Sequence, residues 1–260
     1  MPDIDPTARV SAGAELGKDV RIGPYAIVAD NVVLGEGSVV SAHAVLKDYV
    51  RVGPGCMIGE HAVLGGLPQD TRFRGEKSFL ELDDGVTVRE FATLHRATGE
   101  GERTYVAKGT YIMAYSHVSH NCRLGKNVTV ANSVQLAGHV EVGDAAFLGG
   151  ATGVHQFVRI GRLAMVGAHS YLTQDIPPFL TGSGHPFFVL GPNRVGMERA
   201  GFPQDTQTAI KHLFKLAYKD KRPLSQAVRE LNPKELALDE VKEFIRFIDE
   251  TNRGIRLKCR

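Results

Sequence analysis

Large aliphatic residues recur at every sixth position along most of the first 172 residues. Counting from Ile4, an Ile, Leu or Val stands at eleven consecutive sixth positions through Leu64. The spacing returns briefly at Leu82 and then holds for twelve positions from Val106 to Leu172. An α-helix repeats its apolar face about every 3.6 residues, so this period excludes a helix. Short strands joined by tight turns fit the spacing.

Three such strands make a coil of about 18 residues, and stacked coils bury a continuous aliphatic column that no single coil could bury alone. The chain is therefore predicted to be mainly β, a left-handed parallel β-helix of hexapeptide repeats over residues 1–190. Inserted loops are predicted near 65–80 and 96–105, where the spacing breaks.

The repeat is predicted to end at Pro177 and Pro178, which lack backbone donors for a ladder. Beyond them the apolar residues follow a helical period. Residues 191–260 are predicted to form an α-helical C-terminal domain. The apolar positions of these helices are Ile210, Leu213, Phe214, Ala217, Val228, Leu231, Val241, Phe244, Ile245 and Ile248.

An 18-residue coil also predicts which side chains lie above one another, at about the 4.8 Å spacing of neighbouring strands. The polar segments 117–121, 135–139 and 153–157 should then occupy one edge. Within them Asn121 falls beneath His139, and Gly138 leaves space above His120. The polar residues predicted to gather there are His117, His120, His139, His155 and Gln156. By contrast, His43, His61 and His95 are interpreted as ordinary surface residues.

Composition narrows the class of protein. A net charge of +2 argues against nucleic-acid binding. No run of 18 apolar residues and no apolar leader occur, so a cytoplasmic protein without integral membrane association is expected. The cysteines, Cys56, Cys122 and Cys259, are too scattered for a disulfide framework. Cys56 and Cys122 fall on the small inward position of the repeat, so both are predicted core residues.

Several motifs resemble the UDP-N-acetylglucosamine acyltransferase family, which starts lipid A synthesis. They are SHVSHNCRLG, LAGHVEVGD, GGATGVHQFVRIG, MVGAHS and QDIPPF. In addition, GGLPQDTRF resembles the family's substrate loop, and GPNRVGMERAGF resembles the start of its helical tail. The resemblance covers nearly the whole chain.

The resemblance implies transfer of an (R)-3-hydroxyacyl group to the 3-position of UDP-N-acetylglucosamine. The donor would be acyl carrier protein bearing phosphopantetheine, with no further cofactor and no metal. The enzyme would be a homotrimer with its sites between subunits. His120 matches the general base, and a histidine titrates in the right range for this role. The substrate-binding matches are Asp70, Arg72, His117, Asn121, His139, His155, Gln156, Asn193 and Arg199, and the acyl-groove matches are Ala168 and His169.

Three positions depart from the family pattern. Asn121 stands where an aspartate commonly follows the base, so the support of a carboxylate is absent there. Val195 and Ala200 replace an acidic and a basic residue in the nucleotide-binding stretch. Some branches of the family accept a 3-amino sugar, so that analogue is the alternative acceptor.

Two other classes of protein remain open on the sequence. Some hexapeptide-repeat proteins bind zinc through three histidines between subunits and act as carbonic anhydrases. A β-helix can also serve as a scaffold without catalysis. The basic run KHLFKLAYKDKR is either a solvated helix face or a docking surface for the acidic carrier protein.

Overall fold

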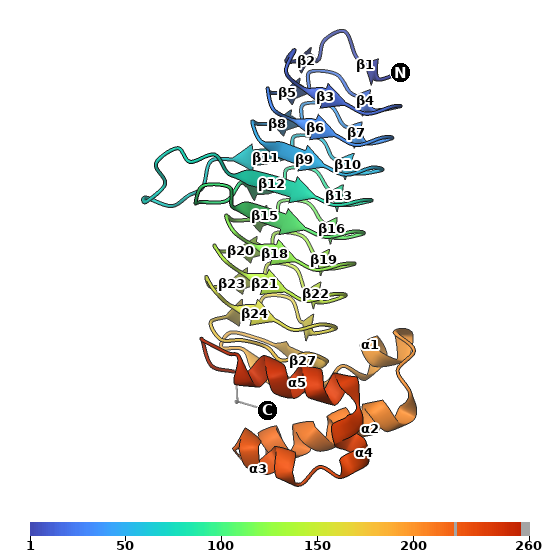
Figure 1. The fold of residues 1–260 in the computed structure, drawn as a ribbon, viewed down its shortest axis with the longest axis vertical. Coiled ribbons are helices and arrows are strands. Elements are labelled where there is room, and N and C mark those ends of the chain that lie inside the picture. The colour runs from blue at the N-terminus through green and yellow to red at the C-terminus, as the bar shows by residue number, and fades with distance from the viewer. Residues whose placement is uncertain (221–222, 256–260) are drawn as a thin grey trace.

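The computed structural model describes residues 1–220 and 223–255, and it contains a parallel β-helix followed by helices (Figure 1). Most strands have two residues, of which the first faces outward and the second inward, as with exposed Arg21 and buried Ile22. Every aliphatic residue of the six-residue period from Ile22 to Leu172 is buried. The predicted fold class is therefore confirmed. Ile4 is 42% exposed because no coil covers it at the open end.

Three sheets form the faces of the β-helix, and successive strands from β1 to β27 belong to different sheets. Sheet A contains β1 (Asp3–Ile4), β4 (Arg21–Ile22), β7 (Val39–Val40), β10 (Met57–Ile58), β13 (Thr87–Val88), β16 (Tyr111–Ile112), β19 (Thr129–Val130), β22 (Phe147–Leu148), β25 (Met165–Val166), β27 (Leu180–Ser183) and β28 (Phe188–Pro192). Sheet B contains β2 (Arg9–Val10), β5 (Ile27–Val28), β8 (Val45–Leu46), β11 (Val63–Gly66), β14 (Thr93–His95), β17 (His117–Val118), β20 (Gln135–Leu136), β23 (Gly153–Val154) and β26 (Tyr171–Leu172). Sheet C contains β3 (Glu15–Leu16), β6 (Val33–Leu34), β9 (Val50–Val52), β12 (Phe79–Leu82), β15 (Arg103–Val106), β18 (Arg123–Leu124), β21 (Glu141–Val142) and β24 (Arg159–Ile160).

The chain turns a corner each time it passes from one sheet to the next. We name these the A–B, B–C and C–A corners after the sheets that they join. A regular corner places one residue in the left-handed backbone region, as Asn121 (φ 58°) and His139 (φ 60°) do at the B–C corner. Small polar residues carry this conformation at lower cost than large apolar ones do.

Small inward residues close the corners from inside. Ser38 donates to the Gly53 carbonyl at 2.9 Å, and the Cys122 thiol donates to Ala137 at 3.1 Å. Burial raises the pKa of the Cys56 thiol to about 11 and that of the Cys122 thiol to about 12. Both cysteines are therefore protonated core residues, as predicted. Cys259 lies outside the described residues.

Two loops interrupt the repeat, and both leave from the B–C corner. The long loop (residues 67–78) connects β11 to β12, and the short loop (residues 96–102) connects β14 to β15. Figure 1 shows the long loop projecting from the side of the β-helix. The loops lengthen their coils without disturbing the stack, since Arg51 still pairs with Glu81 across 30 residues and Thr93 with His117 across 24.

The β-helix does not stop at the prolines. After Pro177 and Pro178 the chain adds β27, which pairs in parallel with β25, and β28 then returns antiparallel to β27. Sheet A therefore extends past the prolines by two strands, β27 and β28, whereas the six-residue repeat itself does not continue. Val166 pairs with Gly182, which breaks the 18-residue register while the hydrogen-bonded sheet continues.

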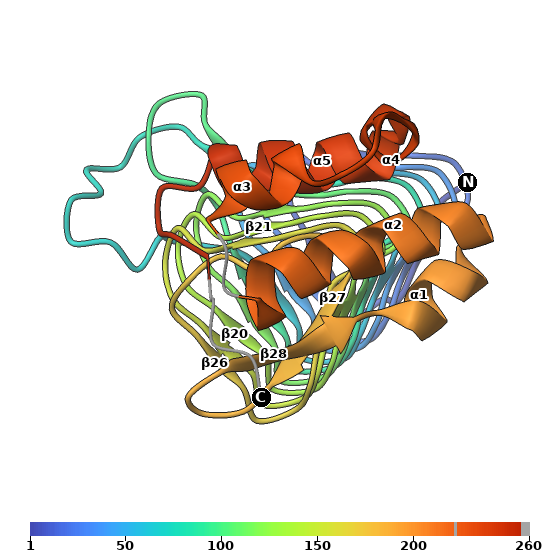
Figure 2. The same ribbon diagram turned by 90° about the horizontal axis from the view of Figure 1, so that it is seen from below.

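The helices cover the C-terminal end of the β-helix (Figure 2). They are α1 (Arg194–Arg199), α2 (Gln204–Phe214), the π-helix η1 (Lys215–Lys219), α3 (Leu224–Arg229), α4 (Pro233–Ala237) and α5 (Asp239–Asp249). Most of the predicted apolar positions are buried in this core. Arg162 of the β-helix pairs with Glu243 of α5 through two nitrogens, at 3.0 and 2.8 Å from one carboxylate oxygen.

Within residues 1–220 and 223–255, no helix is both long enough and apolar enough to cross a lipid bilayer.

Candidate active site

The B–C corner gathers the predicted histidines, as the 18-residue register required. His117 pairs with Gln135, and Gln135 pairs with Gly153, so the three polar segments lie on adjacent coils. They border a groove of about 500 Å³. The residues of interest that line it are Gln69, His117, His120, His155, Gln156 and Tyr171.

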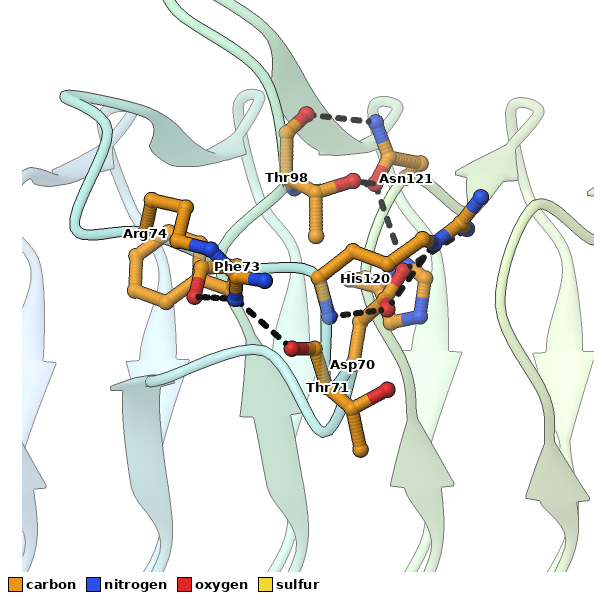
Figure 3. Close-up of polar contacts among 8 residues, drawn as sticks. Asp70, Thr71, Phe73, Arg74, Thr98, His120 and Asn121 are labelled. Atoms are coloured by element: carbon orange, nitrogen blue, oxygen red, sulfur yellow. Dashed lines mark hydrogen bonds and ion pairs between the residues drawn. The ribbon is translucent and has the colours of Figure 1, made fainter.

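His120 is 8% exposed and is held by its neighbour in sequence. Its Nδ1 lies 2.9 Å from Oδ1 of Asn121. The same oxygen accepts the backbone N–H of Thr98 at 2.9 Å, while Nδ2 of Asn121 donates to the Thr98 carbonyl at 3.1 Å. Figure 3 shows this chain of hydrogen bonds from Thr98 through Asn121 to His120.

This arrangement determines the tautomer of His120. A backbone N–H can only donate and a carbonyl can only accept, so Thr98 fixes which end of the Asn121 amide is oxygen. Because that oxygen faces Nδ1 of His120, Nδ1 must carry a proton and donate. In the neutral ring Nε2 is then left with a free lone pair. An imidazole in this state can accept a proton from a substrate.

Gly138 provides the space above the His120 ring. A Cβ atom built on Gly138 would lie 2.6 Å from Cε1 and 2.7 Å from Nε2 of His120. Any larger residue at position 138 would therefore displace the imidazole. The sequence prediction of a gap at this position agrees with the geometry.

His117 and His95 form a second histidine pair beside the groove. His117 Nδ1 lies 2.8 Å from Oγ1 of Thr93, and its ring meets the ring of His95 edge to face at 4.7 Å. Burial lowers the pKa of His117, with a smaller contribution from the charge of His120. Burial also lowers the pKa of His95 to about 4. His95 is therefore neutral at physiological pH.

His139 lies on the other side of the corner. Its ring meets the His120 ring edge to face at 5.3 Å and stacks on Phe157 at 4.6 Å. Burial lowers the pKa of His139, and the charges of His120 and Arg72 lower it further. With Asn121 and Phe157, His139 lines a neighbouring cavity of about 560 Å³.

Asp70 and Arg72 of the long loop form an ion pair next to His120. Arg72 Nη2 lies 2.9 Å from Oδ2 of Asp70, and the backbone N–H of Arg72 donates to Oδ1 at 2.9 Å. These contacts hold the pKa of Asp70 at about 2, with a small contribution from His120. The Asp70 side chain is 10% exposed and that of Arg72 is 80% exposed. The loop therefore presents a guanidinium to solvent above a carboxylate.

Four predicted site residues lie away from the B–C corner of the same chain. Exposed Ala168 and His169 lie on the A–B corner, at the far edge of sheet B from His120. Asn193 caps α1 and donates through Nδ2 to the carbonyl of Leu163, on the C–A corner, at 2.8 Å. Arg199 is exposed at the end of α1. A single chain does not bring these residues to the histidine groove.

Residues 95–98 contribute to the site but were not singled out from the sequence. His95 was interpreted as an ordinary surface residue, yet it is partly buried against His117. Thr98 fixes Asn121, and Arg96 is 7% exposed behind the long loop. The long loop lengthens the coil before this segment, and residues 96–98 belong to the short loop itself, so the 18-residue register could not be applied to them.

No three His, Cys, Asp or Glu side chains come together as a possible metal site in the described parts of the chain. A larger cavity of about 750 Å³ lies between sheet C and α5. It is lined largely by charged residues, among them the paired Arg162 and Glu243, and by none of the predicted site residues.

A hexapeptide β-helix followed by a helical tail is the architecture that two family models match. The model described as bacterial transferase hexapeptide (six repeats) matches residues 13–48 and 103–138. The model described as UDP N-acetylglucosamine O-acyltransferase, domain 2, matches residues 175–256.

Whole-chain relatives narrow the class further. The acyl-(acyl-carrier-protein)–UDP-N-acetylglucosamine O-acyltransferase of Thiobacillus denitrificans is 44% identical over 98% of this chain and 99% of its own length. The enzyme of the same name from Alkalilimnicola ehrlichii is 48% identical with the same coverage. The solved UDP-N-acetylglucosamine acyltransferase from Campylobacter jejuni superposes with a TM-score of 0.91 at 35% identity, covering 98% of this chain and 99% of that one. This chain belongs to the acyl-(acyl-carrier-protein)–UDP-N-acetylglucosamine O-acyltransferase family.

Proposed function

We propose that this chain transfers an (R)-3-hydroxyacyl group from acyl carrier protein to the 3-hydroxyl of UDP-N-acetylglucosamine, the first step of lipid A biosynthesis. Its family membership supports the reaction, and the histidine groove supports the chemistry. A cytoplasmic location, as expected from the sequence, is part of this proposal.

His120 acts as the general base in this reaction. Its Nε2 accepts the proton of the sugar hydroxyl while the oxygen attacks the thioester carbonyl. The new ester C–O bond forms and the C–S bond breaks, and the proton passes to the departing phosphopantetheine thiolate. No covalent enzyme intermediate is required. The Thr98–Asn121–His120 chain is the observation that carries this assignment, because it leaves Nε2 unprotonated.

The remaining predicted residues position substrate. His117, His155 and Gln156 line the groove, and His139 packs against the base. Arg72 is exposed beside Asp70, so its guanidinium is available to a phosphate of the nucleotide. Asn121 serves here as the partner of His120, in addition to its predicted proximity to substrate.

The 3-amino analogue of the sugar nucleotide is a second candidate acceptor, and the presence of Asn121 beside the base favours it. A carboxamide partner carries no charge, so it does not stabilise a protonated imidazole as a carboxylate would. An amine attacks with its own lone pair and can lose its proton afterwards. It therefore needs less help from the base than a hydroxyl does.

The distribution of the predicted residues supports a homotrimer. Ala168 and His169 lie at the A–B corner and Asn193 contacts the C–A corner, so all three are away from His120, and a second subunit could bring such corners into one cleft. Exposed apolar side chains on sheets A and B, such as Met57, Phe147 and Tyr171, give these faces area to bury. Light scattering should give three times the chain mass of 28.2 kDa, and a monomer would rule the trimer out.

The basic run at residues 211–222 is the proposed docking surface for the acidic carrier protein. Lys211, Lys215 and Lys219 are exposed and border an apolar cavity of about 510 Å³ that includes Leu190 and Phe214. Lys221 and Arg222 of the run lie outside the described residues. Association through these lysines should weaken as salt is raised.

One assay tests the reaction. The protein is incubated with 3-hydroxyacyl carrier proteins of several chain lengths and either UDP-N-acetylglucosamine or its 3-amino analogue. Mass spectrometry of the sugar nucleotide should show one added hydroxyacyl group. An ester identifies the hydroxyl acceptor and an amide identifies the amine. If neither acceptor is acylated with any donor, the proposed function is wrong.

A further inference from the structure

Arg96 is a buried cation with an incomplete set of hydrogen bonds. The residue is 7% exposed, and its Nε and Nη1 atoms are buried without a hydrogen-bond partner. Burying such atoms costs free energy, because each gives up its hydrogen bonds to water. An apolar side chain at this position would avoid that cost. An arginine at this position therefore needs another interaction that offsets the cost of burying these atoms.

Two aromatic rings supply that interaction. The guanidinium carbon of Arg96 lies 5.2 Å from the ring centroid of Tyr49 and 5.4 Å from that of Phe73. Both distances are within the range of cation–π attraction, which strengthens when the cation is desolvated. Tyr49 belongs to the B–C corner of the β-helix, whereas Phe73 belongs to the long loop. Arg96 thus links the loop to the body of the protein.

The tip of the long loop has few other anchors. The described hydrogen bonds of the tip (residues 70–76) stay within the loop: Phe73 N–H donates to the Asp70 carbonyl at 3.0 Å, and Arg74 Nη1 donates to the Thr71 carbonyl at 2.8 Å. The end of the loop is bound to the short loop, where Lys77 N–H donates to Glu100 at 3.0 Å. Figure 3 shows this closed turn, with Asp70 and Phe73 on the same loop. Arg96 also holds the start of the loop, since its backbone N–H donates to Gly66 at 3.0 Å.

We propose that Arg96 is a positioning residue that clamps the long loop through Phe73 and so holds Asp70 and Arg72 over the histidine groove. The role of Asp70 and Arg72 in holding the sugar nucleotide rests on the proposed function above. The clamp itself rests only on the contacts of Arg96. Because Arg96 does not touch the groove, it acts on substrate binding through the loop.

A clamp and a purely structural role of Arg96 predict different results for one substitution. Arg96→Met keeps most of the side-chain volume, removes the charge and leaves no unpartnered nitrogen. A purely structural arginine would be replaced without functional loss, and with unchanged or higher thermal stability. A clamp would instead be released, so the variant should fold and melt normally while binding the sugar nucleotide poorly.

The test measures steady-state kinetics and limited trypsin digestion on the same full-length variants. In Arg96→Met, the KM for the sugar nucleotide should rise by about 10-fold or more with kcat changed less than about 3-fold. Trypsin should cut after Arg72 or Arg74 about 10-fold faster, because the free loop fits the protease. Phe73→Leu, which removes the ring on the loop side, should reproduce both changes. Arg96→Lys, which keeps a cation, should restore part of each.

Arg51→Met is the control for loss of a cation–π contact outside the loop; it also removes the ion pair of Arg51 with Glu81. Its guanidinium carbon lies 4.0 Å from the ring centroid of Phe79, but this pair lies on sheet C beyond the end of the loop. The control should keep the wild-type KM and digestion rate. Wild-type values in both Arg96→Met and Phe73→Leu would overturn the clamp, as would a fall in kcat at unchanged KM. If the wild-type protein acylates neither acceptor, the proposed function fails, while the digestion rates still decide the clamp.

Discussion

Two corners of the β-helix contain histidines in quite different settings. At the A–B corner, Tyr25, His43, His61, Phe91 and Tyr115 form a ladder with ring centroids 5.1, 4.8, 4.9 and 5.0 Å apart. These rings are nearly parallel and lie on the surface. At the B–C corner, His120 and His139 meet edge to face, and His120 is buried and hydrogen-bonded to Asn121.

The difference follows from where the repeat is interrupted. Both loops leave from the B–C corner. The long loop brings Asp70 beside His120, and the short loop brings Thr98 against Asn121. The A–B corner receives no insertion, so its rings simply stack at the spacing of the strands. The fold provides a regular surface at every corner, and the insertions convert one corner into a site. Three predictions test this contrast.

Removal of His120 should have the largest effect. His120→Ala is expected to lower kcat by roughly 10²- to 10⁴-fold, the usual contribution of a positioned general base. Thermal stability should change little, since the ring lies outside the aliphatic column. His61→Ala in the A–B ladder is the matched control and should keep normal turnover. Near-normal activity of His120→Ala would place the base elsewhere.

Loss of the Asn121 side chain should have an intermediate effect. Glycine suits the backbone at this position (φ 58°), so Asn121→Gly removes the hydrogen bond to His120 without backbone strain. With the tautomer and the ring no longer fixed, kcat should fall by about 10- to 100-fold, part of the effect of losing the base.

Asn121→Asp completes this second test. It keeps an acceptor at Nδ1, so activity should remain, but the added charge favours the protonated ring. The acidic limb of the pH–rate profile should therefore move to higher pH. A full kcat in Asn121→Gly would show that Thr98 and Asn121 do not orient the base.

Replacement of His95 should have the smallest effect, and it should change stability rather than turnover. Its pKa is lowered to about 4 in the folded protein, whereas an unfolded histidine titrates near pH 6.5. The unfolded state therefore binds more protons between these values, and stability falls as pH drops from about 6.5 to 4. Between pH 7 and pH 5 the wild-type protein should lose about 1–2 kcal/mol of its free energy of unfolding through His95, and His95→Phe should not show this loss. Thermal melts of the wild-type and His95→Phe proteins at the two pH values measure this difference. An equal drop in stability in both proteins would contradict the lowered pKa of His95.

The sequence alone was sufficient for the fold class and for much of the site. The six-residue period is a local pattern, and one aliphatic column per sheet satisfies it within the β-helix, as the buried residues of the period from Ile22 to Leu172 show. The same period set the 18-residue register, which placed His120 beneath Gly138 and gathered His139 at the same edge, in agreement with the structure. The family motifs then gave the residues their expected chemistry, and the family itself is confirmed.

Only the tertiary structure decided what holds those residues in place. The two loops have no period, so the sequence could not show that Thr98 would fix Asn121 or that Arg96 would lie between Tyr49 and Phe73. The Asn121 amide carries no charge, yet it orients His120 through a hydrogen bond that the sequence did not reveal. A repeat determines contacts between positions one coil apart, whereas contacts between inserted loops depend on where each chain segment returns in space.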